Sequence, residues 1–188
     1  MPRGYSRPGV MRVTTLADFT WYRQASIRWT PGELVVHVDP WGVTDPAPAD
    51  LVLITHAHFD HCSPTDIDRV RGATTKVVAP RDVARELSGE VTAVAPGAGV
   101  HVTAVPAYNV VAGREEHHPR ANGWVGYVLE AGGTTWFHAG DTDHVPEHDA
   151  LRVDAAFLPI GGTYTMDAEE AGGLARVMRP GVAVPMHF

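Results

Sequence analysis

The sequence predicts an α+β fold in which helices cover β-sheets, and three observations support this prediction. Nine short runs rich in β-branched and aromatic residues have the length of a strand and end near glycine, proline or aspartate. Fewer segments carry helix-capping signals, and these lie between some of the runs. Strands that outnumber helices, with helices between them, are typical of covered sheets and argue against a bare β-sandwich.

The expected strands follow one another along the whole chain. Gly132-Gly133 separates two of them and predicts a tight hairpin turn, because glycine readily adopts the positive φ that such turns require. The strands are expected at 11–16, 33–39, 51–55, 75–80, 100–107, 123–130, 134–140, 154–160 and 181–188.

Three helices are expected from their capping residues. The first has Ser63 as N-cap and Pro64 at the first helical position, and it is expected to end at Gly72. The third begins with Asp167 and has Glu170 three residues later, which is a capping-box pattern. The helices are expected at 64–72, 80–89 and 168–179.

Length and composition favour one globular domain that covers residues 1–188. Apolar residues make up 44% and charged residues 20% of the chain, as is ordinary for a soluble protein. No run approaches the roughly 18 apolar residues of a membrane span, and the N-terminal segment lacks the apolar core of a signal peptide. One cysteine, Cys62, excludes an internal disulfide and fits the expected cytoplasmic location.

The charge pattern argues against a nucleic-acid partner, and the expected partner is a small-molecule substrate. The formal net charge is −7, Lys76 is the only lysine, and no basic stripe is present. Carboxylates gathered around metal cations contribute to such a negative sum and are compensated when metal binds. Arg114 and Arg120 lie in a loop expected near the site, where either would suit an anionic substrate group or simply face solvent. The oligomeric state is not indicated.

The stretch LVLITHAHFDHCSPTD, residues 51–66, concentrates ligand-type side chains. His56 and His58 are one strand period apart and point the same way, while Asp60 and His61 lie on the turn beyond. Imidazole and carboxylate are the ligands of zinc and similar ions. Four such groups within six residues exceed what one tetrahedral ion takes from one loop, so two metals are indicated. A polar surface turn with chance histidines is the alternative, and it rarely combines so many ligands after a buried strand.

One loop cannot complete two metal sites, so further ligands are expected at the ends of other strands. Asp141 is the candidate for a carboxylate that bridges both ions, because the adjacent Gly140 allows a close backbone approach. The other candidates lie in 115–123, in 137–144 and at the end of the last strand: His117, His118, His138, Asp143, His144 and His187.

Three motifs resemble those of the metallo-β-lactamase superfamily of metal-dependent hydrolases. THAHFDHC resembles its histidine-rich signature loop, HAGDTD its bridging aspartate and VPMHF its last histidine, and the matches run from about Asp39 to His187. LPIGGTYTMDAEEA and FHAGDTD further resemble a bacterial branch related to ascorbate-6-phosphate lactonase and N-acyl-phosphatidylethanolamine phospholipase D. The resemblance implies a four-layer αβ/βα sandwich with a dinuclear site at one edge.

The resemblance also implies a role for each candidate ligand. The first metal would bind His56 and His58, the second would bind Asp60, His61 and His187, and Asp141 would bridge them. In the family a third histidine for the first metal commonly follows the strand that corresponds to 100–107, where this chain has Tyr108-Asn109. His118 is therefore expected in that role, with His117 as the second choice and Asn109 as a weak oxygen ligand.

The expected activity is hydrolysis of an ester, lactone or phosphodiester. Two divalent cations about 3.5–4 Å apart lower the pKa of a bridging water toward neutrality and supply hydroxide. Zinc is the first choice because histidine dominates, and manganese or iron also suits the set. Asp60, which would orient the water, and Asp141 are the expected catalytic residues. A non-catalytic metal-binding protein of this fold and a diiron-type oxidoreductase are the alternatives.

Three further polar residues near these motifs have two interpretations each. Asp39 follows an expected strand and either orients a metal-bound histidine or starts an ordinary turn. His138 and His144 flank Asp141 and either form hydrogen bonds to a ligand or have a plain structural role.

Overall fold

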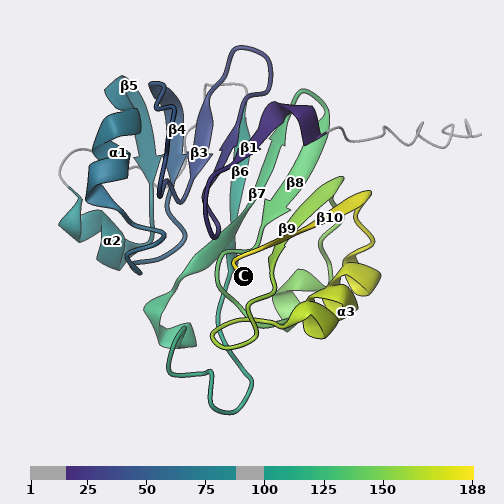
Figure 1. Ribbon diagram of the computed structural model, residues 1–188. Helices are drawn as coiled ribbons and strands as arrows, with labels where there is room; N and C mark the ends of the chain where they lie inside the picture. The colour runs from purple at the N-terminus through teal and green to yellow at the C-terminus, as the bar shows by residue number, and fades with distance from the viewer. Residues whose placement is uncertain (1–15, 88–99) are drawn as a thin grey trace, which may run out of the picture.

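The computed structural model describes residues 16–87 and 100–188, and the strands of these segments form two five-stranded sheets (Figure 1). The first sheet contains β1 (Phe19–Trp21), β2 (Ile27–Trp29), β3 (Val36–Val38), β4 (Ala49–Leu53) and β5 (Arg71–Val78) in that order. The second has the order β10-β9-β8-β7-β6, from β6 (His101–Pro106), β7 (Val125–Ala131), β8 (Thr134–His138), β9 (Ala155–Pro159) and β10 (Val182–Met186). The helices are α1 (Pro64–Val70), α2 (Arg81–Glu86) and α3 (Ala168–Met178), with short 3-10 turns at Leu16–Asp18 (η1), Arg120–Asn122 (η2) and Pro146–His148 (η3).

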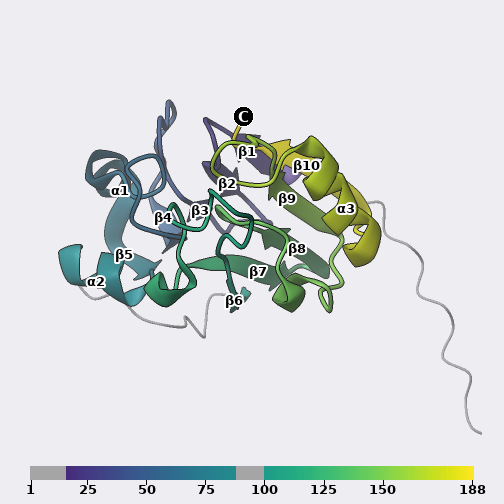
Figure 2. The same cartoon turned by 90° about the horizontal axis from the view of Figure 1, so that it is seen from below.

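The two sheets pack face to face, and helices cover both outer sides. Successive residues of β4 point to opposite faces of the sheet, so Leu51 and Leu53 enter the core between the sheets while Val52 packs with Ile67 of α1. Leu174 of α3 is buried on the side of the second sheet. In Figures 1 and 2, α1 and α2 lie at one outer side of the molecule and α3 at the other. This arrangement is the expected α+β, four-layer αβ/βα sandwich, the metallo-β-lactamase fold.

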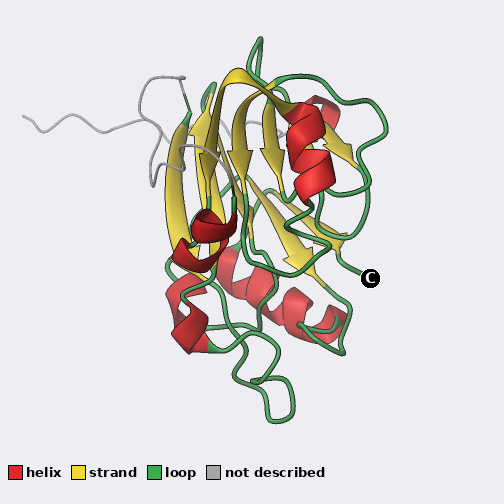
Figure 3. Cartoon of the chain, turned by 90° about the vertical axis from the view of Figure 1, so that its left-hand side faces the viewer, coloured by secondary structure: helices red, strands yellow, loops and turns green. Residues whose placement is uncertain are grey.

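Parallel pairing brings the ends of several strands to one edge of the molecule. β3, β4 and β5 are parallel neighbours in the first sheet, and β8, β9 and β10 are parallel neighbours in the second. The carboxyl ends of parallel neighbours lie at the same edge of a sheet. Long loops lie beyond one end of the sheets in Figure 3. Segments that follow β3, β4, β8 and β10 in the sequence therefore meet in space.

The local sequence signals are confirmed at most elements. Ser63 caps α1 by accepting a hydrogen bond from the Asp66 amide, and Asp167 and Glu170 form the predicted capping box of α3. Gly132 and Gly133 have φ of 59° and 79° in the turn that joins β7 to β8, as the hairpin prediction requires. Strands are present in eight of the nine predicted runs, although their ends differ by a few residues.

Several local predictions differ from the structure or fall outside its described part. Helix α1 ends at Val70 and not at Gly72, because Arg71 already has the extended conformation with which β5 begins. Strands β1 and β2 were not predicted, since three-residue strands are too short to show a hydrophobic period. Helix α2 ends at Glu86 and not near Gly89, because Leu87 already has an extended conformation. Most of the expected strand 11–16 lies outside the described residues, as does Gly89 itself.

The helices of the described segments include none that is both long enough and apolar enough to cross a membrane.

The buried imidazole of His148 is expected to make folding sensitive to acid. Burial lowers its pKa from 6.5 to about 4, and its Nε2–H donates to the Pro106 carbonyl oxygen at 3.0 Å. Between these pH values the unfolded chain binds the proton and the folded chain does not, so stability falls as pH decreases from 6.5 toward 4. Urea unfolding of metal-free protein at pH 6.5 and 4.5 should show a loss of stability that is about 2 kcal/mol smaller in His148→Gln than in wild type. His101→Gln is the matched control, because His101 is an exposed strand imidazole. An equal loss in wild type and His148→Gln would contradict the prediction.

Candidate metal centre

The loop between β4 and α1 carries four of the predicted ligands in one tight turn. Strand β4 is buried from Leu51 to Leu53, and the chain then turns so that the amides of His61 and Cys62 both donate to the His58 carbonyl oxygen, at 3.0 and 2.8 Å. This turn directs His56, His58, Asp60 and His61 toward the edge where the other loops meet. The sequence pattern of this stretch therefore corresponds to a local structure that presents all four side chains.

The remaining predicted ligands come from three distant segments. Asp141 follows β8, and its neighbour Gly140 has φ of 63° and lies so close to Thr55 that an added Cβ would be 3.1 Å from the Thr55 Cβ. His187 follows β10 with φ of 56°, and its amide donates to the Gln24 carbonyl oxygen at 3.2 Å. His118 lies in the loop between β6 and η2. The ends of three strands and one loop thus deliver these side chains to a common point.

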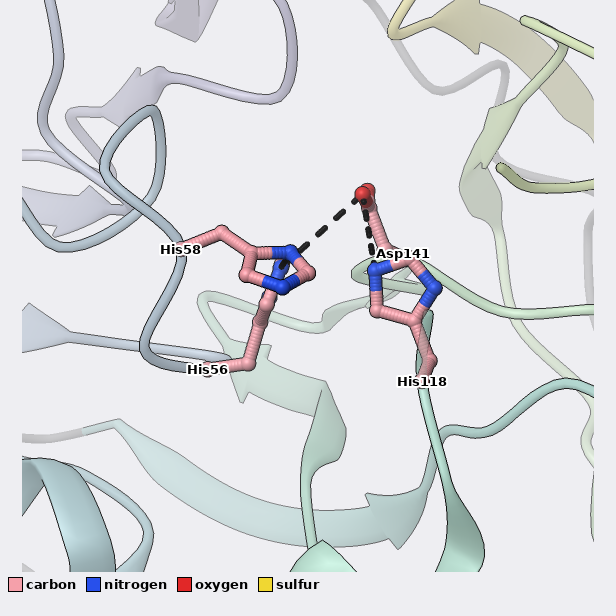
Figure 4. Close-up of side chains that lie close together, drawn as sticks. All are labelled: His56, His58, His118 and Asp141. Carbon is pink, nitrogen blue, oxygen red and sulfur yellow. Dashed lines mark hydrogen bonds and ion pairs between the residues drawn. The ribbon is translucent and has the colours of Figure 1, made fainter. Parts of the chain in front are cut away.

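The seven predicted ligands form two adjacent groups. One group consists of His56, His58, His118 and Asp141, and the other of Asp60, His61 and His187. Within each group, one potential ligand atom from every residue lies within 4.8 Å of the others. Figure 4 shows the first group, with the Asp141 carboxylate facing His56 and His118.

Asp141 lies between the two groups. Its Oδ2 atom is 3.3 Å from Nε2 of His118 in the first group and 3.2 Å from Nε2 of His187 in the second. Its Oδ1 atom is 3.4 Å from Nε2 of His61. One carboxylate in contact with both groups has the position of a bridge between two ions. Asp60 belongs to the second group, and its Oδ2 atom is 3.4 Å from Nε2 of His187.

Several ring nitrogens of the site are buried without a hydrogen-bond partner. Among the described residues, the buried atoms without a partner include the ring nitrogens Nε2 of His61, His118 and His187 and the carboxylate oxygen Oδ1 of Asp141. Nε2 of His56 faces Nδ1 of His58 at 3.0 Å, so two ring nitrogens of neighbouring histidines compete for the same space. Burying unpaired polar atoms costs about 1–3 kcal/mol each. Divalent cations bound by these nitrogens and carboxylates would satisfy them, so the residues fit the metal ions that their chemistry predicts.

Hydrogen bonds at the outer nitrogens set the direction of two site histidines. The Thr55 hydroxyl has one hydrogen, which it donates to Asp39 Oδ2 at 2.6 Å, so it accepts the Nδ1–H of His56 at 2.9 Å. Asp39 Oδ2 also accepts the Nδ1–H of His61 at 2.8 Å. Both imidazoles therefore direct Nε2 into the cluster, which is the orientation that metal binding requires. Asp39 thus orients the imidazole of His61, in line with one of the two interpretations that the sequence left open.

Asn109 orients His118, the histidine of the first group that lies in the loop between β6 and η2. Its Oδ1 atom accepts the Nδ1–H of His118 at 2.6 Å, and its backbone amide donates to the His118 carbonyl oxygen at 2.9 Å. Asp143 holds the same loop by accepting the amides of Val110 and Val111, both at 2.8 Å. The side chain considered as a weak oxygen ligand thus contacts the outer nitrogen of His118, and Nε2 of His118 faces Asp141.

The remaining polar candidates lie outside both groups. His117 packs edge-to-face on Tyr164, with ring centroids 4.7 Å apart. His138 accepts the Gly140 amide and donates to the Ala25 carbonyl oxygen, so its role is structural. His144 pairs with the exposed Asp149 at 2.6 Å. Cys62 is half-buried beside α1, and burial raises the pKa of its thiol to about 11.

Burial and the neighbouring carboxylates shift the pKa values of the site in opposite directions. Burial, reinforced by the charge of His61, holds the pKa of His56 well below its usual value. Burial also opposes protonation of His61, but the carboxylates of Asp141 and Asp39 outweigh it and raise that pKa well above its usual value. Burial raises the pKa of Asp141, and the charge of His61 outweighs it and holds that pKa well below its usual value. A cation bound at Nε2 of His61 would replace the proton on that nitrogen, which the charge of Asp141 stabilises in the metal-free site.

A pocket of about 480 Å³ opens directly onto these groups. Its walls include five of the predicted ligands together with four further residues. The ligands are His58, Asp60, His118, Asp141 and His187, and the others are Gln24, Phe59, His117 and Tyr164.

Neither Arg114 nor Arg120 lines this pocket. The guanidinium of Arg114 is buried between Asp143, at 3.0 Å, and Glu170, at 2.7 Å. Arg120 binds Glu147 at 2.9 Å and covers the Tyr108 ring. The role of gripping an anionic substrate group, which the sequence allowed for either arginine, is not supported by this placement.

Sequence reasoning did not single out Thr55 or Gln24. Thr55 resembles an ordinary strand residue, and only its position before the first site histidine hints at a role. Gln24 has φ of 46° and accepts the amide of His187, a contact between residues 163 positions apart that no local pattern signals.

Comparison with known proteins places this fold and site in a family. The model of the beta-lactamase superfamily domain matches residues 18–187. A UPF0173 metal-dependent hydrolase of Anaeromyxobacter dehalogenans is 31% identical over 205 residues, which cover 91% of this chain and 74% of that protein. A UPF0173 metal-dependent hydrolase of Thermoplasma acidophilum is 31% identical and covers 84% of this chain and 77% of its own length. The crystal structure of a candidate metal-dependent hydrolase from Parabacteroides distasonis has a TM-score of 0.84 and 32% identity, and the match covers 90% of this chain and 81% of that one. The chain therefore belongs to the metallo-β-lactamase superfamily and, within it, to the UPF0173 metal-dependent hydrolases.

His117 and His118 are adjacent in the sequence and provide a matched test of metal binding by the first group. On the prediction of two zinc sites, His118→Ala should lower the affinity of one of them by roughly 100-fold or more, because it removes an imidazole whose Nε2 faces Asp141. His117→Ala removes an imidazole that packs on Tyr164 instead, and both affinities should stay within about threefold of wild type. Competition with a chromophoric chelator measures the two dissociation constants. Circular dichroism of the metal-free proteins establishes that both variants fold. A larger loss in His117→Ala than in His118→Ala would contradict the assignment.

Proposed function

We propose that the protein hydrolyses an ester, lactone or phosphodiester of a small molecule with two divalent cations, zinc being the first choice, and that residues 1–188 act as one domain. The first cation would be held by His56, His58 and His118 and the second by Asp60, His61 and His187, with Asp141 shared between them. The single observation that carries this proposal is the position of Asp141, with its carboxylate 3.2–3.4 Å from imidazole nitrogens of both groups. The names of the relatives support metal-dependent hydrolysis as the type of activity.

The side chains of the site divide the work of hydrolysis. Bound cations of this kind lower the pKa of a coordinated water toward neutrality and polarise the oxygen of the scissile group. Asp60 lines the pocket beside His187 and orients the attacking water. Asp39 and Asn109 hold the imidazoles of His61 and His118 in the direction that binding needs. No serine or cysteine nucleophile is required, in keeping with the raised pKa of Cys62.

The two rival functions make different demands on the same residues. A non-catalytic protein of this fold would bind metal without turnover. A diiron-type oxidoreductase would require iron and an electron donor. The single cysteine is compatible with a reducing compartment, and a cytoplasmic location stays a prediction.

Replacing the bridge tests the proposal. Wild type loaded with zinc, manganese or iron should hydrolyse at least one of p-nitrophenyl acetate, a γ-lactone and bis(p-nitrophenyl) phosphate. Asp141→Ala should lower kcat/KM by at least about 100-fold, because both cations lose a shared ligand. Metal content by mass spectrometry should fall from two ions per chain toward one or none. Asp149→Ala is the control, because that exposed carboxylate pairs with His144 and belongs to neither ligand group. Equal turnover in wild type and Asp141→Ala would overturn the mechanism, and two bound ions without any turnover would favour the non-catalytic alternative.

A further inference from the structure

We propose that the substrate carries a neutral, apolar group next to its scissile bond, an aryl or alkyl chain that lies between Phe59 and Tyr164. This inference rests on the proposed function, because the two rings line the pocket of the candidate metal centre. The proposed function left an ester, a lactone and a phosphodiester open as substrates. Of these, the inference favours an ester or lactone whose acyl side is apolar.

Phe59 is exposed to solvent, and both of its neighbours in the sequence are predicted metal ligands. Its side chain is 76% exposed, and it stands between His58 of the first group and Asp60 of the second. A movement of the loop that buried the ring would also move the neighbouring ligand side chains of His58 and Asp60. Trp41 contacts the ring edge-to-face, with centroids 6.0 Å apart, and fixes its orientation. A phenyl group exposed at this position offers apolar surface to whatever occupies the pocket.

Tyr164 provides apolar surface from another part of the chain. It lies in the loop between β9 and α3, is 52% exposed, and packs edge-to-face on His117. Phe59 follows a strand of the first sheet, and Tyr164 follows a strand of the second. An apolar group that enters the pocket can therefore contact aromatic rings contributed by both halves of the fold, and removing such surface from water is favourable.

Apart from the cations that the proposed function places at the ligand groups, the pocket lining offers little that would attract an anionic group. The lining contains no lysine or arginine, and its two carboxylates, Asp60 and Asp141, belong to the ligand groups. Arg114 is held by Asp143 and Glu170 away from the pocket. An anionic group that lies beyond the scissile bond, away from those cations, would therefore have no lysine or arginine of the lining to contact, and the polar side chains there outside the ligand groups are Gln24, His117 and Tyr164.

A series of p-nitrophenyl esters tests the inference on the metal-loaded protein. The ratio of kcat/KM between hexanoate and acetate should be at least about tenfold in wild type, since each buried methylene contributes about two- to fourfold. Benzoate should exceed acetate, and the anionic hemisuccinate should be slower than the butanoate. Phe59→Ser and Tyr164→Ser should each reduce the hexanoate-to-acetate ratio to about threefold or less. Val177→Ser is the control, because Val177 is an exposed apolar residue of α3 that does not line the pocket, and the ratio should not change. An unchanged ratio in Phe59→Ser and Tyr164→Ser, or faster hydrolysis of the hemisuccinate, would overturn the inference.

Binding of a neutral dye separates this inference from the hydrolase proposal. N-phenyl-1-naphthylamine should bind the metal-loaded wild type at least about threefold more tightly than it binds Phe59→Ser or Tyr164→Ser, whether or not any ester is hydrolysed. Val177→Ser should bind the dye as wild type does. Equal dye affinity in wild type and both pocket variants would overturn the inference. Absence of hydrolysis together with the expected dye binding would overturn only the proposed function.

Discussion

The contact on which the rest of the site depends is the one between Asp141 and the imidazoles of both sheets. Its carboxylate meets His118 and His187 through one oxygen and His61 through the other. These partners come from segments far apart in sequence, and the parallel strands place their ends at one edge of the sandwich. The small Gly140 before Asp141 permits the close approach of the two sheets at this edge.

The cluster carries an energetic cost that explains the hydrogen bonds around it. Burying several imidazoles together leaves ring nitrogens such as Nε2 of His61 and His118 without partners. Thr55, Asp39 and Asn109 satisfy the outer nitrogens with oxygen acceptors, so each ring has one defined orientation and its free nitrogen points inward. The site is therefore pre-organised for cations, and cation binding is expected to stabilise the folded chain.

Local sequence signals predicted the elements that depend on neighbouring residues. The capping box at Asp167, the N-cap at Ser63 and the hairpin glycines act within a few residues, and each is present in the structure. Strands β1 and β2 escaped prediction because three residues carry too little pattern, and their pairing with β3 depends on the tertiary fold. The end of α1 was misplaced because β5 begins at Arg71, where the extended conformation serves sheet pairing.

The sequence by itself determined that His56, His58, Asp60 and His61 are presented from one turn, because strand alternation and a short turn are local properties. It favoured His118 over His117 and Asn109 as the third ligand of the first metal but could not place any of the three. Only the tertiary structure shows that His118 faces Asp141 and that Asn109 contacts the outer nitrogen of His118, because these contacts join distant loops. The same holds for Arg114, which the sequence allowed beside a substrate and which the fold buries between Asp143 and Glu170. Ion pairs and hydrogen bonds between residues far apart in the chain arise only from packing, and no local pattern encodes them.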